Sequence, residues 1–174
     1  MTPLELIWNG WRIRYIEGGA DAAPARSVFT QILASGLPDE ETYIVHRGAR
    51  TFAILNAFPY TTGHLMVLPY REIEGLEELD DAEAAELWPT VTDAVTALKE
   101  AYRPGGVNVG INLGRAAGGS IGEHLHVHVV PRWTGDGNFM TAIANARTLP
   151  EPLAESARRL RDAWRREALG GRRT

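Results

Sequence analysis

The sequence Glu-His-Leu-His-Val-His-Val-Val-Pro occupies residues 123–131 and decides how the fold is interpreted. Histidine recurs at every second position, as His124, His126 and His128, with apolar residues between. Successive side chains of a β-strand point to opposite faces, so a strand here places the three imidazoles on one face and the apolar residues on the other. The apolar face can pack on a helix, which leaves a row of imidazoles for another purpose.

A purely structural role for these histidines is the first alternative. A single histidine is more often structural than catalytic. Three titratable rings side by side, however, carry a cost of desolvation and repulsion that packing alone would not select. Three of the five histidines in the chain fall within residues 124–128. We therefore interpret the row as a functional site.

Metal binding is one function that such a row can have. On a straight strand His124 and His128 lie about 13 Å apart, whereas Zn–N bonds are about 2 Å long. One ion is therefore unlikely to be shared by all three, and the chain has no cysteine to complete a site. The other function is nucleophilic and acid–base chemistry at phosphorus, because a neutral imidazole is a good nucleophile whose neighbours can fix its tautomer. We favour this second interpretation.

A glycine-rich loop directly before the histidines supports phosphate chemistry. Residues 114–122 include Gly119 and Ser120 within the sequence Gly-Gly-Ser-Ile-Gly at 118–122. Glycines let backbone N–H groups approach an anion, and a serine hydroxyl can donate to a phosphate oxygen. A plain glycine turn is the alternative, but its position beside three histidines favours a phosphate-binding loop.

The composition is that of a globular protein without a specialised surface. The 174 residues are 44% hydrophobic and 23% charged, with a net charge of −4. This length predicts one domain, and the charge gives no reason to expect nucleic-acid binding. No apolar run is long enough for a membrane span, and the N-terminus lacks the pattern of a signal peptide. The absence of cysteine excludes disulfides and thiol nucleophiles, and we expect a cytoplasmic protein.

The remaining patterns predict the order of helices and strands. Asp80 followed by Glu83 forms a capping box that opens a long helix ending near residue 102, with Pro89 as a possible kink. Strands are expected at 11–16, 43–45, 51–56, 64–68, 107–113 and 124–130, a linker at 18–25, and helices at 27–34 and 151–169. This order predicts an α+β fold: an antiparallel β-meander sheet with one long helix and one C-terminal helix.

Residues 124–130 match the pattern His-φ-His-φ-His-φ-φ, where φ is apolar, and the chain therefore resembles the histidine-triad (HIT) superfamily over about residues 27–140. Further motifs are similar to an actinobacterial branch of diadenosine tetraphosphate phosphorylase-like proteins. They are Pro-Tyr-x-x-Gly-His-Leu-Met-Val at 59–67, His-Val-Val-Pro-Arg-Trp at 128–133 and Gly-Asp-x-Asn-Phe-Met at 135–140. The resemblance implies a single HIT domain over 1–174, with its core at 27–140 and a C-terminal helix at 150–169.

The resemblance also implies catalytic roles. His126 attacks the α-phosphorus of a nucleotide and carries the nucleotidyl group. His128 hydrogen-bonds the α-phosphate and helps the leaving group depart. His124 fixes the tautomer of the nucleophile from behind, as does His64, for which a buried core histidine is the alternative.

Nucleotide-binding positions follow from the same resemblance. Asn56 contacts the ribose hydroxyls, and Asn112 and Ser120 contact phosphate, with strand-end capping as the alternative for both asparagines. Arg132 can meet phosphate, and Trp133 can line the site or contact a second base. A polar turn with a packing tryptophan is the alternative for this last pair.

The chain departs from the family pattern in three places. Gly119 stands where many relatives have glutamine, and one extra residue separates Ser120 from His124. Ser27 and Thr30 stand where many relatives carry the Cys-x-x-Cys half of a structural zinc site. We therefore expect no metal and no cofactor.

The sequence leaves three functions open. The leading one is a nucleotidyl hydrolase or transferase that acts on a dinucleoside polyphosphate, with inorganic phosphate or water as acceptor. A nucleotide-binding regulatory protein with negligible turnover is second, and a metal-dependent hydrolase is third. We also expect a homodimer that buries the helix from Asp81 to Tyr102. An arginine cluster at 158–166 is expected to be a solvated helix face, with the binding of long polyphosphate tails as the alternative.

Overall fold

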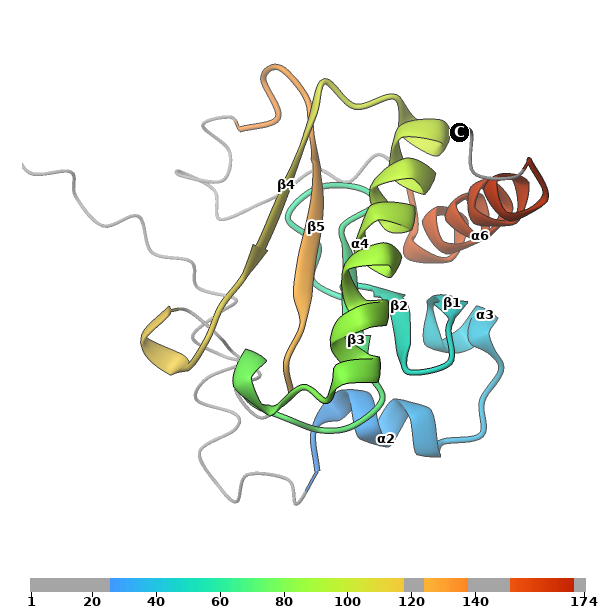
Figure 1. The fold of residues 1–174 in the computed structure, drawn as a ribbon. Helices are drawn as coiled ribbons and strands as arrows, with labels where there is room; N and C mark the ends of the chain where they lie inside the picture. Colours follow the sequence, from blue (N-terminus) through green and yellow to red (C-terminus); the bar gives the residue numbers. More distant parts are fainter. Residues whose placement is uncertain (1–25, 118–123, 138–150, 171–174) are drawn as a thin grey trace, which may run out of the picture.

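The computed structural model describes residues 26–117, 124–137 and 151–170, whose helices and strands are shown in Figure 1. The expected strand at 11–16 and the linker at 18–25 lie outside the described residues. The described residues contain one five-stranded antiparallel sheet. Its strands are β1 (Ile44–Arg47), β2 (Thr51–Leu55), β3 (Leu65–Pro69), β4 (Gly106–Ile111) and β5 (Val127–Arg132). The predicted α+β class is confirmed.

The strands do not follow chain order throughout the sheet. The order is β1-β2-β3-β5-β4, so β5 lies between β3 and β4. The first three strands form a meander, but the long helix α4 (Asp81–Tyr102) connects β3 to β4. Two strands joined by a crossover helix run parallel and need not be neighbours, which leaves room for β5 to pair antiparallel with both. The first three strands therefore form the predicted antiparallel meander. The last two strands are also antiparallel, but β5 lies between β3 and β4.

The three expected helices begin and end close to the expected positions, as α2 (Val28–Ala34), α4 and α6 (Leu153–Gly170). The structure adds the short helix α3 (Asp39–Thr42), which the sequence analysis did not predict, and 3₁₀ turns at Leu76–Glu78 and Arg115–Ala117. None of the helices within the described ranges is long and apolar enough to cross a membrane.

The expected capping box opens α4. The Asp80 carboxylate accepts from the Glu83 backbone N–H at 2.8 Å, and the Glu83 carboxylate accepts from the Asp80 N–H at 3.0 Å. These bonds satisfy two backbone donors that would otherwise have no partner at a helix start. The helix then continues through Pro89 to Tyr102.

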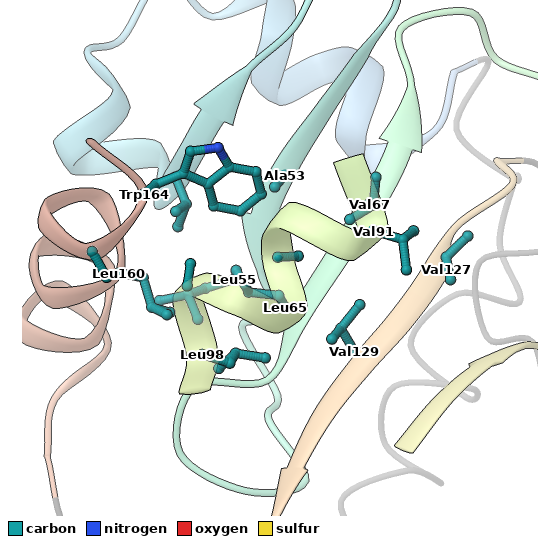
Figure 2. Packing of buried hydrophobic residues seen from close by; sticks show 14 of the residues in the cluster. Ala53, Leu55, Leu65, Val67, Val91, Leu98, Val127, Val129, Leu160 and Trp164 are labelled. Carbon is teal, nitrogen blue, oxygen red and sulfur yellow. The ribbon is translucent and has the colours of Figure 1, made fainter. Parts of the chain in front are cut away.

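The main hydrophobic core lies between α4, α6 and one face of the sheet, as Figure 2 shows. Val91 and Leu98 of α4 pack against Val127 and Val129 of β5, all at most 4% exposed. A second cluster on the opposite face includes Phe29 of α2 with alternate residues of β1, β2 and β3. The even-numbered positions of β5 therefore face away from α4, as the sequence pattern predicted.

The C-terminal helix is attached to β1 by buried polar and aromatic contacts. Arg161 is 8% exposed and donates to the backbone carbonyls of Ile44, at 2.8 Å, and Asp39, at 2.5 Å. Trp164 stacks on His46 with ring centroids 4.6 Å apart. These contacts fix α6 against β1 and the preceding helix α3.

Candidate active site

The three histidines do not all lie in a strand. Strand β5 begins at Val127, so His128 is a strand residue whereas His124 and His126 precede it. The N–H of Leu125 donates to the Ile73 carbonyl at 2.6 Å, a contact to the segment that follows β3. Pairing of β5 with β3 ends at Val127 and Val67, although β3 continues to Pro69, so His126 lies outside the paired region. The strand expected at 124–130 is therefore three residues shorter at its start.

His126 holds its proton on Nδ1. This nitrogen lies 2.8 Å from the backbone carbonyl oxygen of His124, and a carbonyl can only accept. The Nδ1–H must therefore donate, which leaves the lone pair on Nε2. Burial lowers the pKa of His126, against an opposing effect of this hydrogen bond, so the ring is neutral near pH 7. A neutral imidazole with a free Nε2 lone pair is what a nucleophile requires.

His128 has the opposite tautomer, which follows from a chain of hydrogen bonds that begins at Tyr60. The Tyr60 backbone N–H donates to Nδ1 of His64 at 3.1 Å, so Nδ1 is an acceptor. His64 then carries its proton on Nε2, which lies 3.0 Å from Nδ1 of His128 and donates to it. His128 in turn carries its proton on Nε2. Burial, and secondarily His126, lower the pKa of His128 to about 4, so this ring is also neutral.

The two rings are thus neighbours with complementary functions. The centroids of His126 and His128 are 4.7 Å apart, and the rings meet edge to face at 81°. One presents a lone pair and the other an N–H. This arrangement combines a nucleophile with a proton donor.

Both ring nitrogens of His124 are hydrogen-bonded to other groups of the protein. Its Nε2 donates to the Pro69 carbonyl at 2.9 Å, and its Nδ1 accepts from the Ser27 hydroxyl at 2.8 Å. Glu72 accepts from the Ser27 backbone N–H at 2.9 Å and from the Thr30 hydroxyl at 2.5 Å. The hydrogen bond from Thr30 is the main cause of the lowered pKa of Glu72. Ser27, Thr30, Glu72 and His124 together are called the Ser27–Glu72 cluster below.

These contacts differ from the orienting roles that the family resemblance implies. His124 meets the nucleophile through its backbone carbonyl rather than its imidazole. His64 contacts His128 rather than His126. The physical reason is that His124 lies outside the strand, where its ring turns toward α2 and lies 5.6 Å from the Phe29 ring. The sequence pattern did not point to Glu72, because nothing links its position to the histidine row before the chain is folded.

The Ser27–Glu72 cluster does not fit a structural zinc ion. Zinc is held by thiolate, imidazole or carboxylate groups, usually four of them. Ser27 and Thr30 supply only hydroxyls, and both hydroxyls are engaged in the hydrogen bonds given above. Within the described ranges, no group of three or more His, Asp or Glu side chains is placed to hold a metal.

Asn56 caps the end of β2. Its side-chain oxygen accepts from the Phe58 N–H at 2.9 Å, and its amide nitrogen lies 3.4 Å from Nδ1 of His64. The capping alternative therefore describes its present contacts. A role toward ribose remains an expectation.

A cleft of about 910 Å³ opens beside His128. It follows the β4–β5 face opposite the main core and continues to the end of α4 and the start of α6. Four of the expected site residues line it, namely Asn112, His128, Arg132 and Trp133. Gly119 and Ser120 lie outside the described residues.

Arg132 is already paired in this structure. Its guanidinium contacts the Asp136 carboxylate at 2.6 and 2.8 Å and donates to the Asn108 side chain at 2.9 Å. The positive charge of Arg132 is therefore balanced by the negative charge of Asp136. The turn alternative therefore accounts for these contacts, and binding of phosphate remains an expectation.

Comparison with known proteins agrees with this geometry. The profile of the HIT domain family matches residues 38–135, more than half of the chain. The chain belongs to the HIT family. It is 44% identical over 171 residues to a protein of Mycobacterium tuberculosis named "AP-4-A phosphorylase", covering 94% of this chain and 86% of that protein. This relative matches the branch that the sequence motifs indicated.

Two solved HIT structures are similar to this chain throughout most of its length. A zinc-bound histidine triad family protein of Mycobacterium smegmatis has a TM-score of 0.68 and 26% identity, covering 83% of this chain and 97% of that one. A histidine triad nucleotide-binding protein of Sulfolobus tokodaii has a TM-score of 0.67 and 27% identity, covering 84% and 98%. The fold is thus that of HIT proteins.

Proposed function

We propose that this HIT protein is an enzyme that cleaves a dinucleoside polyphosphate, such as diadenosine tetraphosphate, at an α-phosphate through a nucleotidyl-histidine intermediate on His126. The observation that carries the proposal is the opposite placement of protons on His126 and His128, two rings 4.7 Å apart. The name of the Mycobacterium tuberculosis relative supports the substrate class.

The first step forms a bond from Nε2 of His126 to the α-phosphorus and breaks the bond to the bridging oxygen. That oxygen takes the electron pair and departs as a phosphate anion, while the Nε2–H of His128 donates a hydrogen bond that stabilises the developing negative charge. His126 keeps its Nδ1–H bonded to the His124 carbonyl, which stabilises the positive charge that the ring gains. His128 keeps its proton and stays neutral throughout this step.

The second step releases the nucleotide. An oxygen of the acceptor attacks phosphorus, and the bond from phosphorus to Nε2 of His126 breaks with its electron pair returning to that nitrogen. Any proton on the attacking oxygen is released to solvent, and the Nε2–H of His128 stays within reach of the phosphate oxygens. Inorganic phosphate as acceptor produces a nucleoside diphosphate, and water produces a monophosphate. The name of the 44% identical relative supports phosphate as acceptor. Asn56, Asn112, Gly119 and Ser120 would bind ribose and phosphate, with Arg132 and Trp133 in the cleft wall.

Incubation with diadenosine tetraphosphate, with and without inorganic phosphate, tests this function. Mass spectrometry of the products should show adenosine diphosphate and triphosphate when phosphate is present. Monophosphate in both reactions would identify a hydrolase instead. Binding without any turnover across a panel of dinucleoside polyphosphates would favour the nucleotide-binding alternative.

We also propose a homodimer in which the two subunits contact each other through the outer face of α4. The inner face is buried within one chain, but Trp88 on the outer face is 52% exposed. Among the described strands, β4 lies at an edge of the sheet, and its Val109 is 44% exposed. Exposed aromatic surface and a strand at a sheet edge are typical of surfaces that self-associate. Light scattering at micromolar concentration should give twice the chain mass.

The absence of structural zinc and a cytoplasmic location remain parts of the proposal. The hydroxyl groups of Ser27 and Thr30 support the first. Elemental analysis should find less than stoichiometric zinc, and one tightly held equivalent would contradict it. Fractionation of the native cells would test the location.

A further inference from the structure

The arginine cluster of α6 separates into different environments once the chain is folded. Arg158 is exposed and pairs with Glu155 at 2.6 Å and Asp162 at 3.2 Å. Arg161 is buried against backbone carbonyls. Arg159, in contrast, lines the cleft that contains His128. The cluster is therefore not a uniform solvated face.

Arg159 is held in place before any ligand arrives. Its Nη2 lies 3.2 Å from a carboxylate oxygen of Glu151, and its guanidinium carbon lies 5.2 Å from the centre of the Tyr102 ring. The other Glu151 oxygen accepts from the hydroxyls of Tyr102 and Ser156. This carboxylate thus joins the end of α4 to the start of α6. A guanidinium has five N–H donors, and the pair with Glu151 engages only part of them.

The cleft lies next to His128 rather than His126, and this indicates which part of a bound substrate it would hold. His128 lines the cleft, whereas the cleft lining does not include His126. In phosphoryl transfer the attacking atom and the departing oxygen lie roughly in line on opposite sides of phosphorus. With His126 as the attacking residue, the departing part of the substrate extends past His128 into the cleft. Ligand sites are commonly about 300–1,000 Å³, and this cleft lies in the upper part of that range.

We propose that Arg159 forms a subsite for the phosphate chain of the departing nucleotide, so that the enzyme selects substrates whose leaving group carries two or more phosphates. This inference rests on the proposed function, because the direction of the cleft depends on His126 as nucleophile. Arginine is suited to the task, since its planar fork can bind two phosphate oxygens at once. Among the described residues of the cleft wall, Glu151 pairs with Arg159 and Asp136 pairs with Arg132, so these four charges cancel. The selection of phosphate therefore depends on direct hydrogen bonds from Arg159 rather than on a net positive charge.

Arg158 and Arg159 supply a matched pair of variants for the test. Both are substituted by glutamine in the full chain, which keeps a polar side chain with N–H donors and removes the charge. Each variant is assayed with diadenosine tetraphosphate and with the p-nitrophenyl ester of adenosine monophosphate, whose leaving group has no phosphate. Hydrogen bonds to charged groups contribute about 1.5–3 kcal/mol, so Arg159→Gln should lower kcat/KM for the tetraphosphate by about tenfold or more. Arg159→Gln should stay within about twofold for the ester, and Arg158→Gln within about twofold for both.

Equilibrium binding keeps this inference separate from the proposed function. Calorimetric titration with ATP and AMP measures the subsite even if no nucleotide is cleaved. Arg159→Gln should weaken ATP by about tenfold and leave AMP within about twofold, and Arg159→Lys should recover part of the ATP affinity. Equal ATP affinity in wild type and Arg159→Gln would overturn the subsite, whether or not the enzyme turns over. Equal losses for ATP and AMP, or for both substrates, would overturn it as well, because they indicate a general disturbance of α6.

Discussion

His124 and His128, the two outer histidines of the triad, lie four positions apart in the sequence but have opposite environments. His124 is 1% exposed, and both of its ring nitrogens are bonded to protein groups, Ser27 and Pro69. His128 receives one hydrogen bond from His64 and lines the cleft. The first is an anchor that offers only its backbone carbonyl to His126, whereas the second forms part of the wall of the cleft.

This difference has a simple origin in the backbone. His128 lies within β5, paired on both sides, so its side chain must point away from the core. His124 precedes the strand, where its ring is free to turn toward α2 and the Ser27–Glu72 cluster. Equal spacing in sequence therefore does not give equal roles when the secondary structure changes within the motif.

The largest expected effect is at His126, which lies between these two environments. His126→Ala removes the nucleophile, so turnover should fall by at least about 10³-fold while nucleotide affinity changes by less than about tenfold. A nucleotide labelled at the α-phosphate should label the wild type in an acid-labile form and fail to label the variant. Normal turnover by the variant would contradict the covalent mechanism.

His128→Gln should have the next largest effect. Loss of a hydrogen-bond donor to the charge that develops on the leaving oxygen costs about 10²–10³-fold, and the loss should appear with diadenosine tetraphosphate. The p-nitrophenyl ester of adenosine monophosphate has a leaving group that spreads its charge over the aromatic ring, so its turnover should fall less. Equal losses with both substrates would mean that His128 acts only in binding.

Ser27→Ala tests the anchoring of His124 and should have a smaller effect on activity. It leaves Nδ1 of His124 buried without its donor, which costs about 1–3 kcal/mol of unfolding free energy. We expect turnover to fall by up to about tenfold, because the His124 carbonyl that orients His126 becomes less fixed. Imidazole ¹⁵N NMR should show a changed Nδ1 signal for His124.

The exposed Ser35 supplies a control for this substitution, since its hydroxyl bonds only to the nearby Ile32 carbonyl and Leu37 N–H. Ser35→Ala should leave turnover and the histidine signals unchanged. A loss of stability in Ser27→Ala with no change in turnover or in the His126 signals would show that the cluster is only structural.

The smallest expected effect is that of pH between 6 and 8. The pKa of His128 is lowered to about 4, so this ring stays neutral across the range. Burial lowers the pKa of His126 below its usual value, which favours its neutral form as well. Turnover should therefore change by less than about twofold there. As pH falls toward 4, His128 gains a proton on Nδ1, which conflicts with the hydrogen bond from His64, and activity is lost. A midpoint near 6.5 in the kcat/KM profile would show that the rings titrate as exposed histidines do.

Much of the fold could be predicted because its signals are local. The Asp80–Glu83 capping box specifies where α4 begins. Turn residues around two short apolar runs specify β2 and β3, and alternating apolar residues specify β4, each within a few positions. The insertion of β5 between β3 and β4 could not be predicted in this way. It depends on where a 22-residue helix returns the chain, which no short pattern records.

The sequence by itself determined the family, the antiparallel α+β class and the three histidines, because periodicity and motif spacing are properties of neighbouring residues. Only the tertiary structure decided which proton each imidazole carries. The donors and acceptors that decide it, such as the Tyr60 N–H and the Pro69 carbonyl, come from distant segments. The same holds for Arg159, which shares a helix with Arg158 but faces the cleft because α6 packs on α4 and β1. Long-range packing, rather than residue type, separates the cleft histidine His128 from the anchor His124 and the cleft residue Arg159 from the solvated Arg158.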